Sequence, residues 1–176
     1  LHGSEPSTAT FFNDTVVGHS LQTFDTTSFS GYAAHEYWEQ SLHGVDGRSR
    51  LSFPMIERLV ELLLRENPLI LLAVRATYAY VFLDEFQDTT GPQYDLAKIL
   101  FMGSGTKVTA VGDNKQRIMV WAGALPNIFE LFESDFAATR RALISNYRSS
   151  PKLVEIQHTL AWAIDEGYVP ADSKVK

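Results

Sequence analysis

The chain has 176 residues and a mass of 19.7 kDa, which is the size of one domain with a sizeable core. Hydrophobic residues make up 45% and charged residues 20%, so the composition is globular and excludes disordered, collagen-like and fibrous classes. The absence of cysteine excludes disulfide frameworks, thiolate zinc sites and cysteine nucleophiles, and it favours an intracellular, cytoplasmic protein. The longest apolar runs, such as Leu69 to Val74, are far shorter than the ~20 residues that cross a bilayer, so we expect no membrane span.

The formal net charge of −6 is unevenly distributed. Residues 1–53 hold six acidic and two basic side chains with fourteen Ser or Thr residues, which predicts a polar, loop-rich opening. An amphipathic helix is expected around Glu36 to Glu39. Residues 107–152 hold seven basic and four acidic side chains, a mildly basic segment inside an acidic total. The sequence starts at Leu1 without a visible targeting signal, and we interpret it as a piece of a longer chain.

Regular periodicity begins near residue 51. Apolar residues at helical spacing after Pro54 predict a helix that ends near Asn67-Pro68. The apolar run from Tyr80 to Leu83 stops at two acids, as a fully buried parallel strand would. A helix is predicted to begin at Gly91-Pro92, and Lys107 to Val111 predicts a second buried strand.

The pattern of strands and helices continues to the end of the chain. Ile128 to Phe132 predicts a short helix, Arg141 to Ile144 a third strand, and Pro151 to about Glu166 a helix closed by Gly167. Strands that alternate with helices predict an α/β fold with a parallel sheet, here preceded by a helical N-terminal part. Ligands of such sheets bind at the carboxyl ends of the strands.

A polar cluster follows each predicted strand. The clusters are Asp84 to Asp88, Gly112-Asp113 with its continuation to Ala124, and Asn146 to Ser149. Paired acids after a buried strand suit Mg²⁺, because one carboxylate can bind the ion while its neighbour orients or deprotonates a water. The guanidinium of Arg148 offers a fork that phosphate oxygens accept. The sequence therefore predicts a phosphate and metal site.

These clusters resemble three motifs of superfamily 1A DNA helicases of the UvrD/Rep/PcrA type. Val81 to Thr89, followed by Gln93-Tyr94, is similar to the family's Walker B region, or motif II. The segment from Val111 to Ala124 is similar to the third motif, and Asn146-Tyr147-Arg148-Ser149 to motif IV. The motifs stand in family order at family-like spacing, and the similarity extends from roughly Phe53 to Ile164.

The resemblance implies how these residues would handle ATP. Asp84 would hold Mg²⁺ on the β- and γ-phosphates, and Glu85 would be the general base for the attacking water. Gln87 and Gln116 would sense the γ-phosphate and pass its state to the DNA site. Arg148 would reach the γ-phosphate in the manner of an arginine finger.

The resemblance also implies contacts with the nucleobases of ATP and DNA. Tyr147 would stack on adenine. Trp121 would stack on a base of single-stranded DNA, an interaction worth ~1–3 kcal/mol that tolerates any sequence. Met119, where relatives commonly carry Tyr, belongs to the same expected DNA contact. Asp113 would support the residues that contact ATP without contacting ATP itself.

The family's architecture implies a division into three parts. Residues 1–50 would be a linker or a remnant of a 1B-type subdomain. Residues 51–145 would be the C-terminal half of a RecA-like P-loop NTPase domain, domain 1A, and residues 146–176 motif IV with the first helix of domain 2A. The implied function is ATP hydrolysis coupled to translocation on single-stranded DNA and duplex unwinding. ATP and Mg²⁺ are the implied cofactors; single-stranded or partly duplex DNA and the rest of the helicase chain are the implied partners.

The sequence departs from the family pattern at several positions. It contains no Gly-Lys dipeptide and hence no phosphate-cradling loop G-x-x-x-x-G-K-[ST]. Gly103 to Lys107 does not replace that loop, because it precedes a strand and has the order Thr-Lys. Ala122 stands where relatives commonly carry Arg, and Arg117 where they carry Ser. We therefore expect the isolated chain to be inactive as an ATPase.

Two other classes of function stay open. A stand-alone module that docks DNA or a protein partner without catalysis could carry the same motifs. A two-metal nuclease is a weaker alternative, since Asp84, Glu85 and Asp88 are close in sequence, but the three ordered motifs argue against it.

Overall fold

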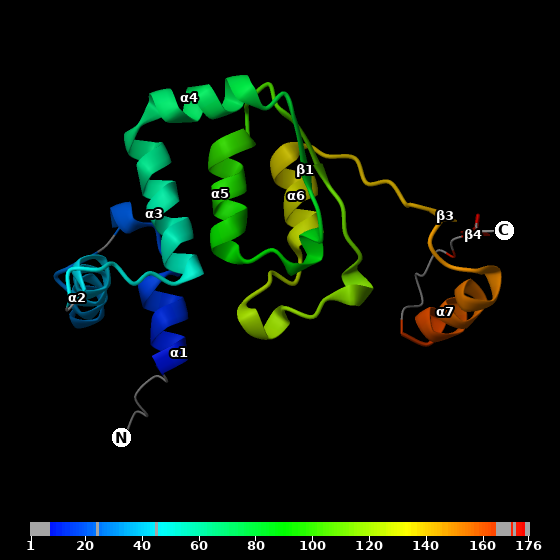
Figure 1. The fold of residues 1–176 in the computed structure, drawn as a ribbon, viewed down its shortest axis with the longest axis horizontal. Helices are drawn as coiled ribbons and strands as arrows, with labels where there is room; N and C mark the ends of the chain where they lie inside the picture. Colours follow the sequence, from blue (N-terminus) through cyan, green and yellow to red (C-terminus); the bar gives the residue numbers. More distant parts are fainter. Residues whose placement is uncertain (1–7, 24, 45, 165–169, 171, 175–176) are drawn as a thin grey trace. The chain divides into compact units, whose positions relative to one another are not determined.

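The computed structural model describes residues 8–23, 25–44, 46–164, 170 and 172–174 (Figure 1). The chain forms two compact units, residues 1–137 and 138–176, and each is described by itself. Among the described residues, no helix has both the length and the apolar character needed to cross a membrane.

The N-terminal part of the first unit is mainly helical. Short helical segments α1 (Thr8–Phe11), η1 (Phe12–Val16) and η2 (Leu21–Thr23) precede the longer α2 (Phe29–His43). Ser28 caps α2 because its hydroxyl accepts the N–H of Gly31 at 3.1 Å. Trp38 of α2 is buried and donates Nε1–H to the carbonyl of Val16 at 3.0 Å. The helix predicted around Glu36 to Glu39 is thus confirmed. The loop-rich structure expected for the N-terminal residues is wrong for α2, because the buried side chain of Trp38 packs this helix into a hydrophobic core.

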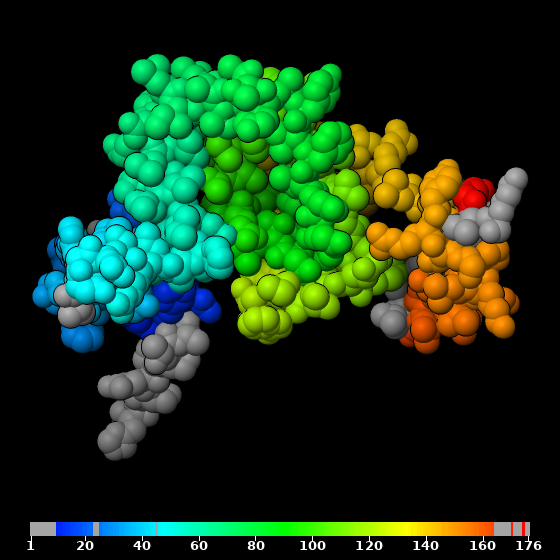
Figure 2. Space-filling view, in the orientation of Figure 1, coloured from blue at the N-terminus to red at the C-terminus, as the bar shows by residue number. Residues whose placement is uncertain are grey.

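Two consecutive helices follow, α3 (Phe53–Glu66) and α4 (Pro68–Thr77). Ser52 caps α3. Pro54 occupies the first turn of α3 and Asn67 ends the helix, as the sequence predicts. The helix α4 was not predicted, because its uniformly apolar run carries no periodic signal. In the space-filling view, α3 and α4 form one continuous surface (Figure 2). Leu69 of α4 is exposed.

The sheet of the first unit is built from β1 (Tyr80–Leu83) and β2 (Lys107–Ala110). The strands are parallel, with Tyr80 opposite Lys107 and Leu83 opposite Ala110. The helix α5 (Gly91–Phe101) joins them and lies beside α3 (Figure 1), which confirms the predicted β-α-β order. The predicted full burial is wrong: Tyr80 and Phe82 are 71% and 73% exposed, because exposure alternates along β1 and the described residues leave one face of the strand uncovered.

Aromatic side chains anchor the segment directly after β1. Phe86, in the turn η3 (Phe86–Asp88), is 1% exposed and makes edge-to-face contacts with Tyr94 of α5 and with two rings of α6 (Ile128–Phe136), Phe129 and Phe132. The hydroxyl of Tyr94 donates to Asp135 of α6 at 2.9 Å. Burial, and after it this hydrogen bond, raises the pKa of Tyr94 above its ordinary value. The helix α6 extends four residues beyond the predicted Phe132.

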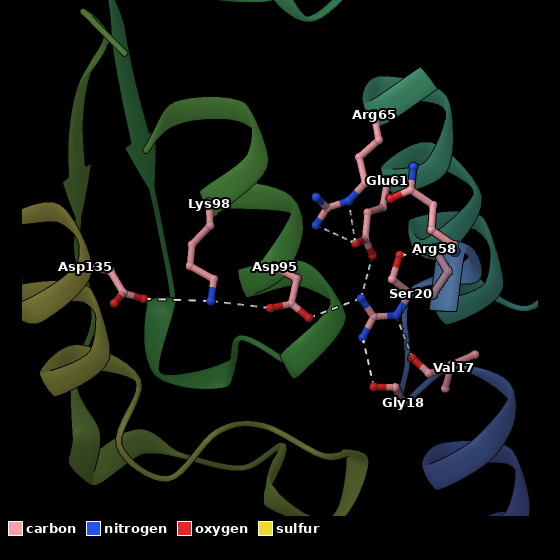
Figure 3. Close-up of polar contacts among 10 residues, drawn as sticks. Val17, Gly18, Ser20, Arg58, Glu61, Arg65, Asp95, Lys98 and Asp135 are labelled. Carbon is pink, nitrogen blue, oxygen red and sulfur yellow. Dashed lines mark hydrogen bonds and ion pairs between the residues drawn. The ribbon is translucent and has the colours of Figure 1, made fainter. Parts of the chain in front are cut away.

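A buried ionic network joins the N-terminal segment to α3 and α5 (Figure 3). Arg58 and Glu61 of α3 are 3% and 2% exposed, and Nη1 of Arg58 lies 2.6 Å from Oε2 of Glu61. The same guanidinium donates to the carbonyl of Val17 at 2.6 Å and to Asp95 of α5 at 3.1 Å. Lys98 continues the network between Asp95 and Asp135 of α6. These contacts bring four segments together around one buried charge pair.

The second unit contains β3 (Ser145–Asn146), α7 (Pro151–Ile164) and β4 (Asp172–Ser173). The strands β3 and β4 pair in parallel with each other. The strand predicted over Arg141 to Ile144 is wrong: these residues have no regular structure, and Leu143 is 81% exposed. An apolar β-rich run forms a strand only beside a partner that accepts its backbone hydrogen bonds, and the described residues give it none. The predicted helix from Pro151 is confirmed, while its predicted closure at Gly167 lies outside the described residues.

Candidate functional site

The first part of the site is the acidic turn, residues 84–88, which follows β1 directly. Asp84 and Glu85 are both exposed, and Oδ1 of Asp84 accepts the N–H of Glu85 at 2.9 Å. Glu85 adopts φ +47° and ψ +38°, the left-handed conformation that residues other than glycine rarely take. Such conformations persist where the surrounding structure imposes them, and they cluster at functional sites.

Gln87 connects the acidic turn to the end of β2. Its side chain is 1% exposed, and its Nε2–H donates to Oε2 of Glu85 at 2.7 Å. Its Oε1 accepts the backbone N–H of Asp113 at 3.0 Å. Both ends of the buried amide therefore have partners, and the carboxylate of Glu85 is held in one orientation.

The close approach of the two strand ends requires glycine at position 112. A Cβ at Gly112 would approach Oε1 of Gln87 more closely than van der Waals contact allows, and it would lie 3.0 Å from the N atom of Phe86. The N–H of Phe86 donates to the carbonyl of Val111 at 2.9 Å. The turn after β1 thus lies directly over the backbone that follows β2.

The second part of the site is the Trp121 loop, residues 112–124, which contains the short turns η4 (Asn114–Gln116) and η5 (Val120–Ala122). Asp113 caps η4 by accepting the N–H of Lys115 at 2.9 Å, and its other oxygen accepts Nε2–H of Gln116 at 3.0 Å. Trp121 is 82% exposed and Met119 is half-buried. The indole of Trp121 is therefore exposed to solvent, in the same loop as Asp113 and Gln116.

Hydrogen bonds join the acidic turn and the two residues after it to the Trp121 loop and Leu125, and we call these bonds the seam. Oδ1 of Asp88 accepts the N–H groups of Ile118 and Met119 at 3.2 and 3.1 Å. The carbonyl of Thr89 accepts the N–H of Leu125 at 2.9 Å. An isolated antiparallel bridge between Thr90 and Ala124 closes the seam.

Four of the predicted ATP-handling residues lie in the first unit, at the carboxyl ends of β1 and β2. They are Asp84, Glu85, Gln87 and Gln116. Asp84 and Gln87 each bond Glu85, and Asp113 links Gln87 to Gln116. The geometry agrees with the expectation that ligand-binding side chains gather at this edge of a parallel sheet.

Tyr147 and Arg148 belong to the second unit, and their part in the site stays a prediction. Tyr147 is 76% exposed. The side-chain carbonyl of Asn146 accepts the N–H groups of Arg148 and Ser149, each at 2.9 Å, which shapes the turn before α7.

Arg117, at a position where the sequence departs from the family pattern, is folded into the Trp121 loop. Its Nη1–H donates to the carbonyl of Pro126 at 3.0 Å. Its Nε and Nη2 atoms are buried and have no hydrogen-bond partner within the described part of the chain. The side chain thus connects the middle of the Trp121 loop to the residues that follow the loop.

The donor set of the acidic turn fits one Mg²⁺ bound together with a nucleotide. Mg²⁺ in such sites is held by one or two carboxylates plus phosphate oxygens, and the exposed carboxylate of Asp84 meets that need. Across the described ranges, no three His, Asp or Glu side chains form a metal-binding group. The carboxylate of Asp88 accepts backbone N–H groups, so the two-metal nuclease alternative lacks support.

Sequence reasoning missed the roles of Asp88 and Gly112. Asp88 was identified only as one acid of a cluster, because its partners lie 30 and 31 residues further along the chain. Gly112 did carry a local signal, since a glycine directly after a strand often marks a close backbone approach.

Comparison with known proteins places this geometry in a family. Residues 11–137 match the model of the UvrD/REP helicase N-terminal domain. The chain belongs to this family. The match ends at the residue where the first compact unit ends, so the acidic turn and the Trp121 loop both lie within the matched domain.

Several named helicases are similar to part of this UvrD/REP-type chain. It is 37% identical over 111 residues to the ATP-dependent DNA helicase Rep of Escherichia coli, a match that covers 62% of the chain and 16% of Rep. A probable DNA helicase of Mycoplasma pneumoniae is 37% identical over 103 residues, covering 58% of the chain and 19% of that protein. DNA helicase II of Haemophilus influenzae is 37% identical over 98 residues, covering 56% and 13%. The matched region is therefore less than a fifth of each of these relatives.

Proposed function

We propose that this chain is part of the motor of an ATP-dependent DNA helicase and forms the C-terminal half of its RecA-like domain 1A. The observation that supports this best is the direct bonding between the turn that bears Glu85 and the loop that bears Trp121. A helicase motor needs such a connection, because the state of the nucleotide must change the grip on DNA. The family membership and the relatives' names agree with this proposal.

The acidic turn would supply the hydrolytic groups. Bound Mg²⁺ would neutralise charge on the β- and γ-phosphates of ATP, and Asp84 is the residue that would hold it. Glu85 would accept a proton from the attacking water at Oε1, while Gln87 holds Oε2. Gln116 would sense the γ-phosphate, since Asp113 links its amide to the end of β2.

The Trp121 loop would supply the DNA contact. Trp121 is 82% exposed, and an exposed indole offers a face on which a base of single-stranded DNA can stack without regard to sequence. Met119, half-buried beside it in the loop, would contact the same strand. Tyr147 and Arg148 of the second unit would contribute an adenine platform and a γ-phosphate contact.

The proposal also covers the domain organisation. Residues 1–50 would be a linker or the remainder of a 1B-type subdomain, residues 51–145 the half-domain described above, and residues 146–176 motif IV with the first helix of domain 2A. Since these 176 residues contain no Gly-Lys dipeptide, the phosphate-cradling loop would have to come from elsewhere in the protein. The isolated chain would then hydrolyse no ATP.

DNA binding by the chain itself tests the first half of the proposal. Fluorescence anisotropy of a labelled oligo(dT) strand should rise on titration with the chain and fall again with added salt, because phosphate contacts release counterions. Trp121→Ala should weaken binding about tenfold, as expected for the loss of one stacked base. Trp162→Ala is the matched control, an exposed tryptophan outside the proposed site. Equal binding by both variants would refute the assignment of Trp121.

The gene that encodes this chain tests the second half. A G-x-x-x-x-G-K-[ST] sequence upstream of Leu1 supports the helicase, and the protein that includes it should hydrolyse ATP in a DNA-stimulated manner that Glu85→Gln abolishes. A start codon at this point would instead support the non-catalytic module. Measurable ATP turnover by the 176-residue chain alone would overturn the expectation that it is inactive.

A further inference from the structure

We propose that Asp88 is a positioning residue that holds the Trp121 loop against the acidic turn. Its two hydrogen bonds would transmit changes between the turn that bears Glu85 and the loop that bears Trp121. The effect on DNA binding rests on the proposed function, whereas the positioning of the loop does not.

The geometry of Asp88 is that of a cap on the loop backbone. One carboxylate oxygen, Oδ1, accepts the N–H groups of two consecutive residues, Ile118 at 3.2 Å and Met119 at 3.1 Å. Hydrogen bonds to an ionised acceptor are stronger than those between neutral groups. Asp88 is itself held in place, since it directly follows the buried Phe86 and Gln87, and its own N–H donates to the carbonyl of Glu85 at 3.0 Å.

Side-chain packing contributes little to holding this part of the loop. Ile118, Val120 and Trp121 are 73%, 58% and 82% exposed, so their apolar surfaces remain largely in solvent. A segment with few buried contacts depends on its hydrogen bonds for a defined conformation. The N–H groups bound by Asp88 directly precede η5, the turn that displays Trp121, so loss of this cap would release the segment that presents the indole.

The same turn connects in the other direction to Glu85. Glu85 is three residues before Asp88, and Gln87 between them bonds the Glu85 carboxylate. A displacement of the loop on DNA would therefore act on Asp88 and through the turn on Glu85. Coupling between two ligand sites is reciprocal in binding free energy, so a ligand of the acidic turn would change the affinity of the loop for DNA by the same factor as DNA changes the affinity for that ligand.

Hydrogen exchange of the 176-residue chain tests the positioning role directly. In Asp88→Ala the amides of Ile118 and Met119 should exchange at least about tenfold faster than in the wild type, because both lose their acceptor. Asp88→Asn keeps an oxygen at the same place without the charge, so its exchange should lie between those of the wild type and Asp88→Ala. Asp88→Ser, with a shorter side chain, should lie closer to Asp88→Ala. Thr89→Ala is the control, since Thr89 contributes its backbone carbonyl to the seam. Unchanged exchange in Asp88→Ala would overturn the proposal.

A second measurement tests transmission along the seam. In the wild type, bound oligo(dT) should slow hydrogen exchange at the backbone amides of Phe86 and Asp88. In Asp88→Ala, bound oligo(dT) should slow exchange at amides near Trp121 and leave exchange at positions 86 and 88 unchanged. Equal protection at Phe86 in both proteins would refute transmission through Asp88. If the wild type binds no oligo(dT), the proposed DNA contact fails, while the exchange rates without DNA still decide whether Asp88 positions the loop. Tryptophan emission, in which Trp38 is the buried contributor, and far-ultraviolet circular dichroism verify that each variant is folded.

Discussion

Replacing Arg58 by Met should destabilise the chain through the charge it leaves behind. Met fills a similar volume without charge, so the substitution removes the guanidinium while most of the packing is kept. Arg58 is 3% exposed and donates to Glu61, Asp95 and the carbonyl of Val17 (Figure 3). After the change, Glu61, which is 2% exposed, loses one of its two cationic partners.

The magnitude follows from what Glu61 retains. Breaking a buried ion pair by removing one partner costs ~3–5 kcal/mol because an uncompensated charge stays buried. Here Oε1 of Glu61 keeps Arg65 at 3.0 Å, and Asp95 keeps Lys98 at 3.6 Å, so the cost belongs at the lower end, about 3 kcal/mol. The double variant Arg58→Met with Glu61→Leu removes both buried charges, and the expected cost falls to ~1 kcal/mol, the value of the lost bond to Val17.

Urea unfolding measures this difference. The change in tryptophan emission on unfolding reports mainly the N-terminal segment, because Trp38 is buried and bonded to Val16 whereas Trp121 and Trp162 are already exposed. Circular dichroism reports the helices. With slopes of ~1–3 kcal/mol per molar urea, a loss of about 3 kcal/mol moves the midpoint by roughly 1–3 M. The reasoning is refuted if the double variant is as unstable as Arg58→Met, because the cost would then come from lost shape or lost cation contacts rather than from a charge without its partner.

Three further predictions concern single positions of the first unit. Gly112→Ala should cost ~1–3 kcal/mol of unfolding free energy, because the added Cβ displaces the buried Gln87; an unchanged urea midpoint would show that this approach is loose. Ala137→Gly should stabilise by ~0.5–1 kcal/mol, since Ala137 has φ +48° at the end of α6, and a lower melting temperature would contradict this. The folded-state pKa of Tyr94 lies above its ordinary value of 10.0, so stability from its neutral hydroxyl is complete below about pH 10 and is lost as pH rises through the folded value. Tyr94→Phe gives up the bond to Asp135 and should therefore be less stable than the wild type near neutral pH. Above pH ~10 the variant should lose less stability than the wild type, because it has no hydroxyl to ionise. Urea midpoints of the two proteins that change in parallel from neutral pH to above pH ~10 would contradict this prediction.

Local signals were sufficient for the elements that they define completely. The helix after Pro54 and the helix at Gly91-Pro92 both carry first-turn prolines and capping residues, and both form where predicted. The strands at Tyr80 and Lys107 were predicted from short apolar runs next to polar clusters. Their exposed faces could not be predicted from those runs, because burial depends on what the rest of the chain places over the sheet.

The misses have the same physical origin. The run from Arg141 to Ile144 has the composition of a strand, yet a strand also needs a neighbour, and composition says nothing about neighbours. The bond from Asp88 to the loop spans 30 residues, so no local pattern contained it. Asp84, Glu85 and Gln87 could be identified because they are neighbours in the sequence. The hydrogen bonds by which the buried amide of Gln87 joins Glu85 to Asp113 are visible only in the structure.

The left-handed conformation of Glu85 is imposed by the structure that surrounds the acidic turn. A non-glycine residue in a sparsely populated conformation costs of order 1–3 kcal/mol, which the neighbouring structure must offset. Phe86 offsets it by full burial among three aromatic rings, and its N–H bonds the carbonyl of Val111. Burial of a Phe side chain contributes ~1.5–3 kcal/mol, enough to balance the strain. The aromatic core around Phe86 therefore holds the turn that bears Asp84 and Glu85. Substitutions in that core should change the conformation of the turn, although the substituted side chains do not contact Asp84 or Glu85.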